Sequence, residues 1–264
     1  MKINEKWRRL GWRHPLWDYV RFYSVVRGQQ KALKDNWLEN MRSAKLEIVP
    51  GENIPIDPGH AQLFFEYLGA RDADAARANG RLRTEEEALA FCRKMEVEAA
   101  TNVTQLTGYY QSSKSLIAGV AAVVKAVCDE KNIAFVPSPQ RRCAWLVGNQ
   151  LHVTARNLDG AIPDLANPSV VWEIKEYWGK TKGGSKMSDA VYECNLVGRE
   201  LREFEERSGA KITHVVFVDG KEQWAHRQSD MRRFLDLFHQ GLIDNLFVGL
   251  DVETEWRETL SSLV

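Results

Sequence analysis

A run of β-branched and aromatic residues, VVWEIKEYW at Val170–Trp178, constrains the fold more than any other stretch of this chain. This composition predicts a β-strand. Strand side chains alternate between two faces, so Glu173 and Lys175 share one face while Trp172 and Ile174 share the other. The strand therefore presents a carboxylate and an ammonium group on the same side.

A second carboxylate, Asp164, precedes this strand in the segment PDLANPS. The turn that Asn167–Pro168 suggests would bring it beside the face of Glu173. Two carboxylates can bind a hard cation such as Mg²⁺, which polarises a phosphoryl group and lowers the pKa of a bound water. A lysine on the same face can hold or deprotonate that water, or offset charge on phosphorus. The alternative is a surface strand with an exposed ion pair.

The surrounding segments predict an ordered α/β core. Residues 112–131 are rich in Ala and Val and predict a buried helix, and residues 144–155 predict a β-hairpin with a turn at Gly148–Gln150. After the strand at Val170, an apolar stripe with spacings of 4, 3, 4 and 3 predicts a helix over residues 188–206. Ile212–Val218 is an apolar run of strand length. The predicted order is helix, strand, strand, strand, helix, strand.

Pro163-Asp164 followed by Glu173-x-Lys175 on the third strand of this order resembles the PD-(D/E)XK nuclease superfamily, and type II restriction endonucleases in particular. The resemblance covers about 105 residues. It implies an α/β restriction-endonuclease-like core with a mixed sheet, and a Mg²⁺-dependent endonuclease that hydrolyses DNA in a restriction or defence system. Asp164 and Glu173 would be the metal ligands, and Lys175 would activate water or stabilise charge. One departure is the long interval at residues 156–162, which leaves Asp164 on a strand extension or in a loop.

Two further glutamates are accessory candidates. Glu193 borders the apolar stripe near the start of the helix over residues 188–206, where it is either exposed or turned inward as an outer ligand or a lysine-orienting group. Glu96 lies on a helix predicted after Thr84, and some nucleases of the resembling superfamily add a helical glutamate to the metal site. The alternative for Glu96 is a solvated helix face.

Charge is unevenly distributed along a chain whose formal net charge is zero. Residues 1–45 carry eleven Lys or Arg against four Asp or Glu, interleaved with aromatic residues. Such segments contact nucleic-acid backbones and bases, although core aromatics beside a solvated basic face give the same pattern. We divide the chain into a helical N-terminal region, residues 1–110, and a catalytic domain, residues 111–264. The DNA-binding candidates are Arg8, Arg9, Arg13, Lys180, Lys182 and Lys186.

Other classes of protein receive less support from the sequence. The Gly/Lys-rich segment at residues 179–186 is not a Walker A loop, the histidines lack metal-site spacing, and the four cysteines lack a CxxC pair. No apolar run reaches the length of a membrane span, and the N-terminus has no apolar signal core, so we expect a cytoplasmic protein without membrane contact. Double-stranded DNA is the expected partner, and a homodimer would cut both strands with two related sites. A non-cleaving nucleic-acid-binding module and a repair or junction-resolving nuclease are the alternatives.

Overall fold

One mixed sheet organises the second half of the chain in the computed structural model, which describes residues 4–101, 112–139, 141–179 and 185–264. Its strand order is β3 (Val136–Pro137), β6 (Gly160–Ile162), β7 (Val170–Glu176), β8 (Thr213–Asp219) and β9 (Asn245–Val248). β6 is antiparallel to both of its neighbours, β3 and β7, whereas β7, β8 and β9 are parallel. The predicted α/β class with a mixed sheet is therefore confirmed.

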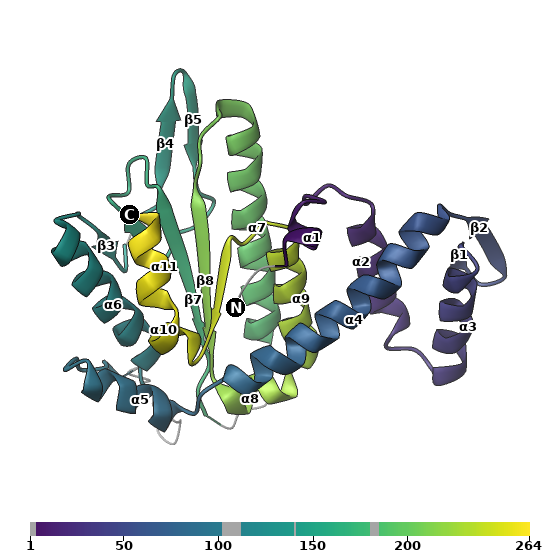
Figure 1. The fold of residues 1–264 in the computed structure, drawn as a ribbon, viewed down its shortest axis with the longest axis horizontal. Helices are drawn as coiled ribbons and strands as arrows, with labels where there is room; N and C mark the ends of the chain where they lie inside the picture. Colours follow the sequence, from purple (N-terminus) through teal and green to yellow (C-terminus); the bar gives the residue numbers. More distant parts are fainter. Residues whose placement is uncertain (1–3, 102–111, 140, 180–184) are drawn as a thin grey trace.

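Helices cover both faces of this sheet (Figure 1). On one face, α6 (Ser115–Lys131) and α11 (Trp256–Leu263) bury Trp172, Phe217 and Phe247 in a common cluster, with α5 (Glu85–Lys94) packed beside α6. On the other face, α7 (Ser185–Ser208) and α9 (Gln228–His239) pack on the remaining side chains of β8 and β9. The stripe predicted for α7 is buried as expected; its members are Ala190, Cys194, Val197, Leu201 and Phe204.

The predicted hairpin forms, but outside this sheet. Strands β4 (Ala144–Val147) and β5 (Gln150–Val153) pair with each other as a separate two-stranded sheet, which projects beyond the main sheet in Figure 1. Two shorter strands, β3 and β6, take the places beside β7 that the prediction gave to the hairpin. Strands of two and three residues are too short for alternation to reveal them in a sequence.

The N-terminal part has its own hydrophobic cluster, centred on Trp7, Trp17, Trp37, Phe64 and Tyr67. Three tryptophans of this basic segment, Trp7, Trp17 and Trp37, are thus core residues. The elements around the cluster are α1 (Glu5–Arg8), α2 (Leu16–Val26), α3 (Lys31–Arg42), and a hairpin of β1 (Lys45–Val49) and β2 (Glu52–Pro55).

Helix α4 (Pro58–Arg81) joins this cluster to the sheet-bearing part of the molecule (Figure 1). It begins after the side-chain cap Asp57, and its 24 residues span about 36 Å. Its first half contributes Phe64 and Tyr67 to the N-terminal cluster, whereas Ala75 and Ala78 pack with α7 and α9. The hydrophobic clusters therefore divide the chain within α4, well before residue 110.

Short helices complete the C-terminal half, with α8 (Lys221–His226) after β8 and α10 (Asp251–Thr254) after β9. Among the described residues, no helix combines the length and the apolar character that a bilayer crossing requires.

Candidate functional site

Strand pairing brings Asp159, rather than Asp164, to the level of Glu173. Gly160 is the partner of Trp172 across β6 and β7, and Asp159 directly precedes it. The Asp159 N–H donates to the carbonyl of Trp172 at 2.9 Å, and the N–H of Ile174 donates to Asp159 Oδ2 at 2.7 Å. The Asp159 carboxylate therefore lies against the backbone of the strand segment that carries Glu173.

This close pairing depends on a glycine. A Cβ atom placed on Gly160 would lie 1.8 Å from the Trp172 ring, so the buried indole crosses a position where only hydrogen fits. Trp172 packs toward α6 on the opposite face of the sheet from Glu173. The anchoring of one face thus sets the register that aligns the carboxylates on the other.

Glu173 is fully buried and has cationic or polar partners on both oxygens. Its Oε2 lies 2.9 Å from Lys175 Nζ and 2.5 Å from Arg156 Nη1, and its Oε1 lies 3.2 Å from His214 Nε2. His214 Nδ1 lies 3.0 Å from the carbonyl of Leu242. Because a carbonyl only accepts, Nδ1 carries a proton, and the contact with Glu173 is a hydrogen bond only when Nε2 is also protonated.

Glu193 is turned toward the same cluster. Its Oε2 accepts from Lys175 Nζ at 2.8 Å and lies 2.7 Å from Arg156 Nη1. Two carboxylates and two cations thus alternate around one point, with Lys175 almost buried and Glu193 about two-fifths exposed. The inward alternative for Glu193 agrees with this geometry.

The protonation states follow from these contacts. Burial alone would raise the pKa of Glu173, but Lys175, the His214 hydrogen bond and Arg156 outweigh it and hold that pKa well below its usual range. Burial and the Arg156 charge would likewise lower the pKa of Lys175, but Glu173, with help from Cys194 and the Glu193 hydrogen bond, raises it above its ordinary value. The pair is therefore charged at neutral pH.

Asp159 differs from Glu173. Burial raises the pKa of the Asp159 carboxyl, and the Glu173 charge adds to this rise. The Ile174 N–H, Lys175 and Arg156 act in the opposite direction. A divalent cation between Asp159 and Glu173 would relieve both the burial cost and the repulsion.

The donor set has the chemistry that a hard cation requires. Asp159, Glu173 and Glu193 supply carboxylate oxygens, the ligands that Mg²⁺ prefers. Arg156 Nη1 already lies between the oxygens of Glu173 and Glu193, so positive charge is stable at that point. Within the described ranges, no group of three or more His, Cys, Asp or Glu side chains is already arranged around a metal position. A bound metal would have to replace Arg156 there.

The structure does not bring Asp164 to Glu173. Asp164 is exposed two residues beyond the end of β6, at the opposite end of that strand from Asp159, and its Oδ1 accepts from the N–H of Leu165 at 2.6 Å. The sequence-based alignment took the second core strand to be β5, whereas β6 holds that place. With β6 as the second core strand, the carboxylate that lies level with Glu173 is Asp159, directly before β6, and not Asp164, two residues after it.

The remaining predicted residues are more scattered. Glu96 is exposed beyond the C-terminus of α5, among the helices on the opposite face of the sheet. Arg8 pairs with Asp244 at 2.5 Å and Arg13 with Glu206 at 2.8 Å, so both tie the N-terminal segment to the rest of the protein. Arg9 and Lys186 are exposed, and Lys180 and Lys182 lie outside the described residues.

Three residues at the site were not predicted from the sequence: Asp159, Arg156 and His214. The segment RNLD at residues 156–159 contained a usable signal, because it ends with an acid directly before an apolar run at Gly160. Recognising that signal required knowing that Gly160–Ile162 is a strand.

Comparison with known proteins identifies the family of this chain. Residues 83–263 match the model of a family described as a domain of unknown function, DUF7687. The chain belongs to this family. The matched part contains the sheet, α7 and every residue of the cluster around Glu173, whereas α1, α2, α3 and the whole of α4 lie outside it. No curated protein and no solved structure gives a significant match.

Proposed function

We propose that this protein is a metal-dependent endonuclease that hydrolyses DNA phosphodiester bonds at the cluster of Asp159, Glu173 and Lys175. The observation that carries the proposal is the fully buried Glu173 carboxylate 2.9 Å from Lys175, with Asp159 bonded to the backbone between them. Asp159 and Glu173 would hold Mg²⁺, which would polarise the phosphoryl group and lower the pKa of a bound water.

Lys175 has a definite part in this proposal. Its raised pKa keeps the ammonium charged, so it is suited to donate hydrogen bonds to a phosphoryl oxygen and to offset negative charge that develops there. A charged ammonium cannot accept the proton of the attacking water. Of the two roles that the resemblance allows, charge stabilisation therefore fits this arrangement better.

Glu193 is a positioning residue, and Arg156 is the counter-ion that a bound metal would replace. Glu193 Oε2 accepts from Lys175 Nζ at 2.8 Å, and so restrains the ammonium together with Glu173. Arg156 offsets the negative charges of Glu173 and Glu193, which would otherwise repel each other. The restriction-endonuclease-like core, a role in defence and a homodimeric assembly belong to the same proposal and rest on the resemblance alone.

A second candidate is a non-cleaving nucleic-acid-binding module. It is favoured by the completeness of the ion-pair cluster, since each Glu173 oxygen already has a partner. A cluster of this kind is also able to serve as a structural network that never binds metal. The two candidates differ in whether Lys175 affects bond cleavage.

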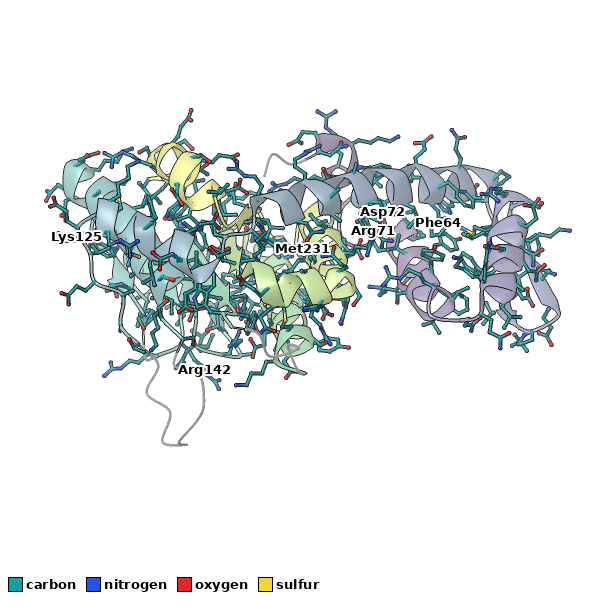
Figure 2. All side chains as sticks on the ribbon, turned by 90° about the horizontal axis from the view of Figure 1, so that it is seen from below. Phe64, Arg71, Asp72, Lys125, Arg142 and Met231 are labelled. Atoms are coloured by element: carbon teal, nitrogen blue, oxygen red, sulfur yellow. The ribbon has the colours of Figure 1, made fainter. Side chains whose placement is uncertain are left out.

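Plasmid cleavage tests the proposal directly. Supercoiled DNA is incubated with the wild type in Mg²⁺ or in EDTA, and with Lys175→Ala and Lys125→Ala, both checked for folding by circular dichroism. Lys125 is an exposed residue of α6, paired only with Asp129 among the described residues, and is labelled in Figure 2. We expect Mg²⁺-dependent nicking that Lys175→Ala lowers on the order of 100-fold and Lys125→Ala leaves unchanged. Equal cleavage by Lys175→Ala and the wild type would contradict the proposal, and no cleavage by the wild type would favour the non-cleaving module.

A further inference from the structure

A hollow of about 490 Å³ lies where the N-terminal helices meet the layer of α7 and α9. It is lined by arginine side chains from α2, from the residue that follows α2, and from α4 and α9. Figure 2 shows Arg71, on α4, at this junction. The five arginines of the lining, with the aromatic residue at its edge, are Arg21, Arg27, Arg71, Arg232, Arg233 and Tyr192. The site is separate from the Glu173 cluster and does not depend on the proposed nuclease function.

Some of these arginines have carboxylate partners. Arg232 Nε lies 2.8 Å from Asp72, Arg233 Nη1 lies 3.0 Å from Asp230, and Arg21 pairs with Asp18 on the same helix. These pairs hold the guanidinium groups at the rim in place. Within the residues that the structure describes, the two other arginines, Arg27 and Arg71, lack a carboxylate partner at comparable distance.

Arg71 and Arg27 are incompletely neutralised. Arg71 is 4% exposed, reaches Asp236 only at 3.4 Å, and its Nε has no hydrogen-bond partner among the described residues. Arg27 forms no ion pair within the described part of the chain, and burial together with the charges of Arg232 and Arg71 lowers its pKa. A buried guanidinium N–H without an acceptor costs free energy that a bound anion would recover.

The rim adds an aromatic surface. Tyr192 is 59% exposed, and the Arg233 guanidinium carbon lies 4.5 Å from its ring centroid. A planar ring of a ligand can stack on tyrosine or guanidinium faces of this kind. The hollow also has the volume of small-molecule sites, which begin at roughly 300 Å³.

We propose that this hollow binds a phosphorylated small molecule of nucleotide size, with phosphoryl oxygens on Arg27 and Arg71 and a planar ring beside Tyr192. Arginine presents a fork of N–H donors that matches phosphate geometry. A concave site with guanidinium groups converging from three helices suits a compact polyanion better than the extended backbone of a duplex. Because Arg27 follows α2 while Tyr192 lies on α7, the ligand would bridge the N-terminal helices and the layer of α7 and α9.

Isothermal titration calorimetry on the full chain in EDTA tests the proposal, with inorganic pyrophosphate, ATP and a 20-nucleotide single-stranded DNA as probes. Arg27→Gln is the test variant, because no ion pair of the described residues is lost with it. Arg42→Gln is the matched control, on the exposed side of α3 away from the hollow.

We expect saturable binding of pyrophosphate or ATP with one site per chain, weakened at least tenfold in Arg27→Gln and unchanged in Arg42→Gln. Tighter binding of ATP than of pyrophosphate would support the proposed stacking of a planar ring beside Tyr192. Absence of saturable binding of both small probes, or equal binding by Arg27→Gln and the wild type, would overturn the proposal. Binding of the DNA alone, sensitive to Arg27→Gln, would also overturn it by assigning the arginines to nucleic-acid phosphates.

Discussion

At the scale of single residues, Arg156 holds the position that a metal ion would take. Its Nη1 lies 2.5 Å from Glu173 and 2.7 Å from Glu193, and its side chain is about one-third exposed. A side chain with that exposure can leave the cluster for solvent without unfolding its surroundings. In the proposed site, Arg156 would therefore compete with a divalent cation for the same carboxylates.

Arg156→Gln removes this competitor. We expect the affinity for Ca²⁺ to rise by about tenfold, equivalent to about 1.4 kcal/mol, because two carboxylates lose one neutralising charge. Calorimetric Ca²⁺ titration of the variant measures this, with Arg257→Gln on α11 as the control at a surface ion pair. An affinity that is unchanged or lower in Arg156→Gln would show that no cation binds between Glu173 and Glu193.

At the scale of elements, long segments with a clear period were predictable and short ones were not. The spacing of Ala190, Cys194 and Val197 identified α7, and the composition of Val170–Trp178 identified β7. Strand β6 has three residues, all buried, and is defined by tertiary pairing with β7 rather than by any local pattern. Because β6 was missing from the prediction, the hairpin took its place and Asp164 was chosen as the second acid. Glu173, Lys175 and Glu193, which the structure brings together, lie on elements that the sequence could predict.

The junction between β7 and α6 should make stability depend on pH. Glu176 Oε2 accepts from the N–H of Leu116 at 2.9 Å in the first turn of α6, and burial raises the pKa of this carboxyl to about 7. The folded state therefore binds this proton more tightly than the unfolded state, in which the pKa lies near its ordinary value of about 4.3. Stability from this group is present at low pH and is lost as the pH rises from about 4.3 through 7.

We expect the free energy of unfolding to fall over this range, and Glu176→Gln to reduce the fall by on the order of 1–3 kcal/mol. The amide keeps an oxygen to accept from Leu116 and has no charge to bury. Asp219, whose pKa burial raises to about 6, acts in the same direction and remains in the variant. Urea denaturation at pH 5 and pH 7.5 provides the comparison; parallel pH profiles for variant and wild type would rule this assignment out.

At the scale of the whole molecule, two of the basic residues predicted to contact DNA, Arg8 and Arg13, join the two parts of the chain. Arg8 pairs with Asp244 just before β9, and Asp244 also binds Arg202 at 3.0 Å. Arg13 pairs with Glu206 near the end of α7. Sequence could reveal the excess of positive charge but not its partners, which lie about 190 to 240 residues away.

The two pairs differ in exposure, which predicts unequal contributions to stability. Side-chain exposure is 35% for Arg8 and 10% for Asp244, against 62% for Arg13 and 49% for Glu206. We expect Arg8→Gln to lower the free energy of unfolding by about 1 kcal/mol and Arg13→Gln to lower it less, because solvent screens the exposed pair. Urea denaturation measures both, and a larger loss in Arg13→Gln would contradict the ranking.

The central claim is that Asp159, together with Glu173 and Lys175, forms a metal-dependent phosphodiesterase site. Asp159→Asn and Asp164→Asn are the most direct pair of variants, because they make the same chemical change at opposite ends of β6. The measurement is the rate of Mg²⁺-dependent plasmid nicking by each folded variant. The account predicts loss of cleavage on the order of 100-fold in Asp159→Asn and wild-type cleavage in Asp164→Asn; wild-type cleavage by Asp159→Asn, with loss in Asp164→Asn, would contradict it.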